Sequence, residues 1–146
     1  MATVQRFEEL KVWQDAMRLD QRIWETTRSD VFRTDPSLRE QILRSGGSVA
    51  DNIAEGFERG SKNEFLRFLT ISKGSAGEVR SQLHRCRNRR FIANETFTEL
   101  YQSADQIGGK IRRLSDHLNR SEHKGVRYKI NEPESLYETL TNYAEL

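Results

Sequence analysis

Apolar residues recur every three to four positions in four long segments of this 146-residue chain, and no segment alternates in the manner of a β-strand. The segments run from about Phe7 to Ser29, from Pro36 to Phe57, from Ser61 to Cys86 and from Glu95 to Asn119. Two of them begin at a capping box, Ser37 with Glu40 and Ser61 with Glu64. The spacing therefore predicts four amphipathic helices.

The predicted buried stripe of each helix is narrow, which accounts for a chain with 35% apolar and 32% charged residues. The first stripe holds Val12, Ala16, Leu19 and Ile23, widened by Trp13, Met17 and Trp24. The second holds Ile42, Gly46, Val49, Ile53 and Phe57. The third holds Phe65, Leu69, Ser72, Ala76, Val79, Leu83 and Cys86. The fourth holds Phe97, Tyr101, Ala104, Ile107, Ile111, Leu114 and Leu118.

Short connections separate these segments, near residues 29–35, 58–60 and 88–93. Short connections make consecutive helices antiparallel neighbours, so we expect an all-α fold, an antiparallel up-down-up-down four-helix bundle over residues 1–120. Residues 121–146 are expected to form a short C-terminal extension, a linker followed by a short amphipathic helix. Glycines inside the helices indicate either close helix approach, within the bundle or between subunits, or a tolerated exposed face; they are Gly46, Gly47, Gly74, Gly77, Gly108 and Gly109.

The chain is poor in groups that carry out catalysis or bind metals. Its single cysteine, Cys86, excludes an intrachain disulfide and falls on the predicted core stripe, and His84 lies two positions away, on a different face of the helix. No phosphate-binding loop, dinucleotide motif, nucleophile elbow or Glu-x-x-His pair is present. We therefore expect no enzymatic activity, no metal and no cofactor. The absence of a membrane-spanning run or signal peptide predicts a cytoplasmic location.

The formal net charge of +2 hides an uneven distribution. Residues 1–120 hold 21 basic and 17 acidic side chains, whereas residues 121–146 hold three and five. One basic cluster has no acid between Val79 and Asn94, and comprises Arg80, Arg85, Arg87, Arg89 and Arg90. A second follows the fourth helix, with Lys110, Arg112, Arg113 and Arg120. Either the clusters contact nucleic-acid phosphates or they form a solvated, ion-paired face, and the antiparallel order allows them to mark opposite ends of the bundle.

The segment from Asn52 to Phe57 (NIAEGF) places Asn52 and Glu55 beside the apolar row, where a structural role is favoured over a functional one. Together with Phe7–Gln14 (FEELKVWQ) and Ser61–Leu69 (SKNEFLRFL), it resembles the 23S rRNA intervening-sequence protein family of four-helix bundles. The resemblance covers about residues 7–119. Its signature positions in this chain are Trp13, Asn52, Glu55 and Gly56. The chain departs from the family pattern at Gly46-Gly47 and Asp51, and in the arginine-rich end of the third helix.

The resemblance implies a homo-oligomer, typically a pentamer, with no known catalytic residues. A related branch, the accessory proteins of diversity-generating retroelements, binds nucleic acid and the reverse transcriptase of the element. The leading hypothesis is thus a non-enzymatic oligomeric bundle whose two basic clusters bind RNA or DNA, largely without sequence preference. The alternative is an adaptor that recruits a protein such as a reverse transcriptase without touching nucleic acid. A nuclease, the third option, lacks a recognisable set of metal ligands.

Overall fold

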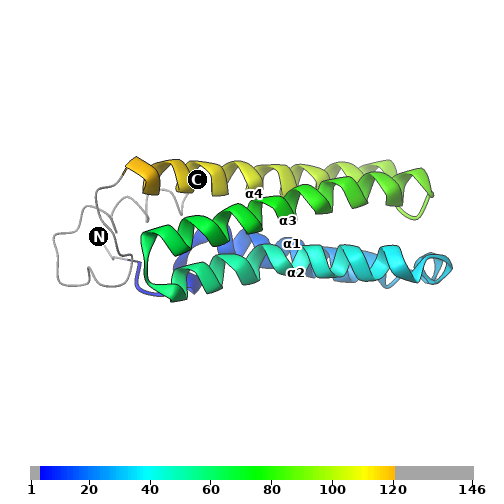
Figure 1. Ribbon diagram of the computed structural model, residues 1–146. Helices are drawn as coiled ribbons and strands as arrows, with labels where there is room; N and C mark the ends of the chain where they lie inside the picture. Colours follow the sequence, from blue (N-terminus) through cyan, green and yellow to red (C-terminus); the bar gives the residue numbers. More distant parts are fainter. Residues whose placement is uncertain (1–3, 121–146) are drawn as a thin grey trace.

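The computed structural model describes residues 4–120, which form four α-helices joined by short connections (Figure 1). They are α1 (Lys11–Thr27), α2 (Pro36–Arg59), α3 (Lys62–Asn88) and α4 (Asn94–Arg120). Two short 3-10 helices precede α1 and α2, η1 (Phe7–Glu9) and η2 (Asp30–Thr34). No β-strand occurs within residues 4–120. The all-α, up-down-up-down bundle predicted from the sequence is confirmed, whereas the predicted extension over residues 121–146 lies outside the described residues.

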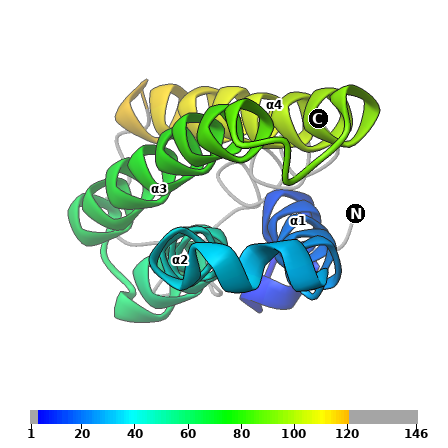
Figure 2. The ribbon, with the colours of Figure 1, turned by 90° about the vertical axis from the view of Figure 1, so that its right-hand side faces the viewer.

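The helices are arranged as two pairs. Viewed along the bundle, α1 and α2 lie on one side and α3 and α4 on the other (Figure 2). The most extensive contacts join α2 to α3 and α3 to α4, and α1 packs against both α2 and α4. Sequential helices are thus spatial neighbours, as the short connections predict.

The core lies between the four helices and is built from the predicted stripes. Every position predicted for the inner faces of α2 and α3 is buried, and on α4 Tyr101 alone is half-buried. On α1 the narrow stripe of Val12, Ala16, Leu19 and Ile23 is buried, but Met17 and Trp24 are exposed. The prediction that these two side chains widen the buried stripe is wrong, because α1 packs on its neighbours through a narrower face.

The helix ends agree with the local sequence rules at α3 but differ from them at α2 and α1. Ser61 caps α3 as predicted, since its Oγ accepts a hydrogen bond from the N–H of Glu64 at 3.2 Å. The predicted cap at Ser37 is wrong: Asp35 caps α2 by accepting from the N–H of Leu38, and Pro36 takes the first helical position. The chain also enters α1 later than predicted, because Leu10 is extended and separates it from η1.

The glycines inside the helices divide into two groups. A Cβ built on Gly56 would lie 2.7 Å from Cβ of Phe68, and one on Gly46 would lie 2.9 Å from Cδ1 of Ile23, so these positions allow close helix approach. A Cβ on Gly74 or Gly108 would meet nothing within 4 Å. Both of the interpretations left open by the sequence therefore apply, each to different positions.

None of the helices within residues 4–120 combines the length and the apolar character needed to cross a bilayer.

Candidate nucleic-acid interface

The antiparallel order of the helices brings the α1–α2 and α3–α4 connections to the same end of the bundle (Figures 1 and 2). Residues 28–39 and 85–94, which form these connections and the adjoining helix turns, together carry seven arginines and two aspartates. We call these two segments the basic end. The high density of cations makes it the strongest candidate on the described surface for binding a polyanion.

Direct contacts join the two connections into one surface. The rings of Phe32 and Phe91 meet edge to face, with centroids 5.1 Å apart. Arg89 Nε lies 3.1 Å from Oδ2 of Asp35, and Arg85 Nη2 donates to Oε1 of Gln41 at 3.0 Å. Segments about 55 residues apart in the sequence are thereby held together.

The four predicted arginines at this end, Arg85, Arg87, Arg89 and Arg90, are indeed brought together, but they have different environments. The guanidinium of Arg87 lies 3.8 Å from the centroid of the Phe97 ring. Arg85 and Arg87 are half-buried, whereas Arg89 and Arg90 are exposed. Within residues 4–120, Arg90 makes no ion pair with a carboxylate. Of the four, Arg90 is therefore the most available to an external anion.

Arg90 also occupies a backbone position that normally requires glycine. Its φ of 59° is left-handed, and α3 ends there in a Schellman arrangement. The N–H of Phe91 donates to the carbonyl of Cys86, and the N–H of Arg90 to that of Arg87, each at 2.9 Å. A side chain in this conformation costs about 1 kcal/mol relative to glycine. The chain thus places a cation at the tip of the basic end at some cost in stability.

Three further arginines of the basic end, Arg28, Arg33 and Arg39, were missed by the sequence analysis. They are spread over the α1–α2 connection and alternate with Asp30 and Asp35, so they do not form an acid-free run. They could have been predicted from the topology, because an antiparallel four-helix bundle must bring its first and third connections to one end.

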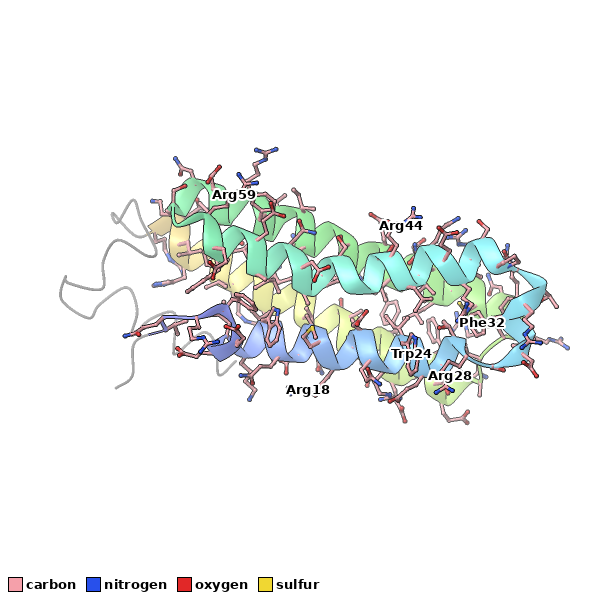
Figure 3. The ribbon with its side chains drawn as sticks, turned by 90° about the horizontal axis from the view of Figure 1, so that it is seen from below. Arg18, Trp24, Arg28, Phe32, Arg44 and Arg59 are labelled. Carbon is pink, nitrogen blue, oxygen red and sulfur yellow. The ribbon has the colours of Figure 1, made fainter. Side chains whose placement is uncertain are left out.

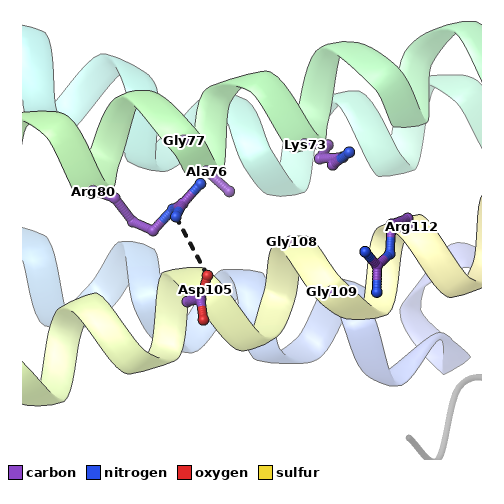
Figure 4. Close-up of a pocket in the computed structure, with 8 residues that line it drawn as sticks. All are labelled: Lys73, Ala76, Gly77, Arg80, Asp105, Gly108, Gly109 and Arg112. Atoms are coloured by element: carbon purple, nitrogen blue, oxygen red, sulfur yellow. Dashed lines mark hydrogen bonds and ion pairs between the residues drawn. The ribbon is translucent and has the colours of Figure 1, made fainter.

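A second basic surface lies in the groove between α3 and α4 (Figure 4). The groove has a volume of about 300 Å³ and a floor of small residues that includes Gly77, Gly108 and Gly109. Arg80 and Arg112, predicted in separate clusters, both line it, together with the unpredicted Lys73. Arg80 Nη1 lies 3.3 Å from Oδ1 of Asp105, the acidic residue of the lining.

The remaining predicted cations do not join either surface. Lys110 Nζ lies 2.6 Å from Oδ2 of Asp15, and both side chains are only 16% exposed, so this ion pair bridges α4 to α1. We therefore remove Lys110 from the candidate interface. The guanidinium of Arg113 lies beside Gly109, and Arg120 is the last residue of α4, at the opposite end of the bundle. The predicted cluster on α4 is thus divided, because Arg112 lines the α3–α4 groove and Lys110 pairs with Asp15 of α1.

The signature residues lie within the bundle rather than at the basic end. Asn52 donates from Nδ2 to the carbonyl oxygen and to Oγ of Ser48, both at 2.8 Å, and Ser48 contacts Ser75 of α3 at 2.9 Å. Gly56 allows α2 to approach Phe68. Their surroundings are those of packing residues at the α2–α3 interface.

The other two signature positions also make local contacts. Glu55 accepts from Arg59 on the same helix at 2.9 Å. The half-buried ring of Trp13 packs edge to face on Phe7, with centroids 5.2 Å apart. Neither contact belongs to the two basic surfaces.

The described residues show no group of three or more histidine, cysteine or acidic side chains placed to hold a metal ion. Cys86 is buried in the core, as its place on the heptad seam predicts, and burial raises the pKa of its thiol to about 11. A thiol with so high a pKa is protonated at neutral pH and is a poor nucleophile. Cys86 is therefore a packing residue.

Comparison with known proteins agrees with the architecture. A solved structure from Bacteroides thetaiotaomicron, described as a protein of unknown function from the S23 ribosomal protein family, superposes with a TM-score of 0.65. The two chains are 21% identical over 71% of this chain and 97% of the other, a level of identity that supports the fold alone. No curated protein matches the sequence.

The sequence itself matches a family over most of the bundle. The match runs over residues 8–113, which takes in α1, α2, α3 and most of α4, together with the Trp13 and Asn52–Gly56 signature positions. The chain therefore belongs to the family of 23S rRNA-intervening sequence proteins.

Proposed function

We propose that this protein is a non-enzymatic, oligomeric bundle that binds RNA or DNA through its basic end, mainly by contacts to phosphates. The observation that carries the proposal is that two connections with seven arginines and two aspartates between them meet at one end of the bundle (Figure 2), bordered by Glu25, Glu40 and Glu95. Arginine binds phosphate through a planar fork of donors, and such contacts carry no sequence information. The α3–α4 groove, with Lys73, Arg80 and Arg112, supplies further cations.

The contacts within the basic end decide how this proposal is best tested. Arg87 packs on Phe97, and Arg89 pairs with Asp35. Changing either arginine would therefore also disturb the fold. Arg90 is exposed, and Arg33 has only a surface ion pair with Asp30, in which both side chains are at least 85% exposed. The double variant Arg33→Glu/Arg90→Glu therefore changes the charge and spares the core.

We expect the unmodified protein to bind labelled RNA and DNA at about 50 mM salt and to lose affinity steeply towards 200 mM. The double variant should bind much more weakly and show a salt slope smaller by about two, one for each lost phosphate contact. Arg67→Glu is the matched control, because Arg67 is exposed on α3 near the opposite end. Absence of binding at 50 mM salt, or equal loss in the control, contradicts the proposal.

Oligomerisation, expected as a homopentamer from the family resemblance, is part of the proposal because several basic ends in one assembly bind a long polyanion by avidity. Light scattering of the full chain measures the mass directly. A monomer at micromolar concentration would remove the avidity argument.

A second candidate function is an adaptor that recruits a protein, such as the reverse transcriptase of a retroelement, without contacting nucleic acid. It is favoured by exposed apolar side chains outside the basic end, Met17 on α1 and Ile71 on α3, which are 42% and 43% exposed. Under this alternative the arginines serve ion pairs such as Arg89–Asp35. Binding to a partner that persists in 0.5 M salt and falls in a Met17→Ser/Ile71→Ser variant would support it.

A further inference from the structure

Trp24 lies on the outer side of α1, next to the basic end, and is 44% exposed (Figure 3). The guanidinium of Arg28, one turn further along, lies 4.7 Å from the centroid of its ring. Trp24 does not belong to the buried core. Arg28 covers one side of the ring and adds a positive charge behind it, which leaves the exposed part of the indole for a flat, electron-rich group to stack on.

A pocket of about 400 Å³ lies beside this pair, between the end of α1 and the start of α2. Arg28, Arg33 and Arg39 line it, so Arg28 belongs both to the Trp24 stack and to the pocket. Arg39 is oriented by a hydrogen bond from its Nε to the carbonyl of Thr27 at 3.0 Å. Three acids lie within two positions of these arginines in sequence: Asp30 forms an exposed pair with Arg33 at 3.5 Å, whereas Asp35 pairs with Arg89 at 3.1 Å and Glu40 with Arg44 at 2.8 Å.

This arrangement of an exposed indole beside three arginines matches the two parts of an unpaired nucleotide. We propose that Trp24 and Arg28 stack a base of a single-stranded nucleic acid while the phosphate next to it enters the pocket of Arg28, Arg33 and Arg39. The proposal rests on the proposed function and names its substrate class. Stacking needs a base with a free face, which a duplex offers only at its ends, so the basic end prefers single strands to duplexes.

Charge and shape favour this occupant over an acidic protein segment. A carboxylate-bearing peptide would satisfy the arginines but offers no flat ring to the Trp24 face, whereas every nucleotide carries both groups at a fixed short spacing. Stacking on aromatic residues is tolerant of sequence, which agrees with binding without sequence preference.

The test uses the intrinsic fluorescence of Trp24 in the full-length chain. The chain has two tryptophans, so Trp13→Phe leaves Trp24 as the only reporter and keeps an aromatic ring against Phe7. Titration with a short oligothymidylate, and with a uridine oligomer of the same length, should quench this fluorescence. A covalently closed circular duplex, which has no exposed base-pair ends, should quench it weakly or not at all at the same phosphate concentration.

Substitution of Trp24 then measures the contribution of stacking. Trp24→Ala should lower the affinity for the single strand by roughly tenfold and leave that for the duplex unchanged, and Trp24→Phe should restore most of the loss. Met17→Ala is the matched control, because Met17 is equally exposed two turns earlier on the same helix and lies away from the pocket. It should leave both affinities unchanged.

The outcomes separate this proposal from the one on which it rests. If Arg33→Glu/Arg90→Glu weakens binding but single strands and duplexes bind equally and Trp24→Ala has no effect, the phosphate interface stands and the stacking site is overturned. If no nucleic acid binds, both fail. If Trp24 fluorescence changes with protein concentration alone, a second copy of the chain covers the indole, and the stacking site is likewise overturned.

Discussion

The α2–α3 interface and the basic end each bring two segments of the chain into contact, but they differ in how they treat polar side chains. At the interface, Ser72 donates to the carbonyl of Val49 at 2.6 Å and Gln82 donates to Ser45 at 3.0 Å, so buried neutral donors are paired, although Oε1 of Gln82 has no hydrogen-bond partner within residues 4–120. At the basic end, charged side chains remain near the surface, and Arg90 accepts an unfavourable backbone conformation. The signature residues Asn52 and Gly56 thus belong to a packed interface, whereas the cations of the basic end are the groups that contact phosphates in the proposed function.

The largest expected effect is a loss of stability when the α2–α3 interface is disturbed. In Gly56→Ala the new methyl group would lie 2.7 Å from Cβ of Phe68 and 3.4 Å from Cα of Phe65, so the helices must move apart. We expect the free energy of unfolding to fall by about 1–3 kcal/mol, measured by urea denaturation.

Gly74→Ala is the control for this substitution. It is also inside a helix, but its new Cβ meets nothing within 4 Å, so it should stabilise the protein by up to about 1 kcal/mol. Nucleic-acid affinity of the folded Gly56→Ala variant should remain that of the unmodified protein. Equal destabilisation by both substitutions would show that close approach at Gly56 is not the cause.

A smaller effect, with opposite signs for stability and for binding, is expected at the basic end. Arg90→Gly relieves the left-handed backbone and should raise the free energy of unfolding by about 1 kcal/mol. The same change removes a cation and should weaken nucleic-acid binding with a salt slope smaller by about one. Paired denaturation and binding measurements check this, and a variant that loses stability would refute the account of the α3 end.

The smallest expected effect is a pH dependence of the stability of the bundle, as distinct from binding at the basic end. Burial, and to a smaller extent the charge of Arg120, lowers the pKa of His117 on α4. The unfolded chain therefore binds a proton more readily than the folded one, so stability falls as the pH drops below about 6.5 and is fully present above it. Arginines do not titrate in this range, so their contribution to binding at the basic end should stay constant.

Denaturation of the unmodified protein and of His117→Gln at pH 5.5 and 7.5 measures this difference. The pH dependence should be smaller in the variant. If both proteins lose the same stability on acidification, His117 is not the group responsible.

The buried stripes were predictable because each is a local pattern. Leu69, Ser72 and Cys86 follow the heptad on α3, and burial of any one of them requires burial of the others on the same face. Trp24 could not be placed this way, because it borders the stripe of α1 and its burial depends on how closely α2 and α4 approach. The partner of Lys110 was equally hidden, since Asp15 lies 95 positions away in the chain.

The candidate interface, like the core, was predictable where a local sequence pattern marks it and hidden where distant segments meet. The acid-free run around Arg85–Arg90 is visible in the sequence, but its union with Arg28, Arg33 and Arg39 is not, because those arginines alternate with aspartates. Contacts such as Phe32 with Phe91 bring the two connections into one surface.

By itself, the sequence determined the four helices, their order and the residues facing the core, because helical periodicity and short connections act over a few turns. Only the tertiary structure decided which charged groups meet. Charge pairs such as Lys110 with Asp15 join residues on different helices, and their geometry depends on the rotation and spacing of whole helices rather than on any local pattern.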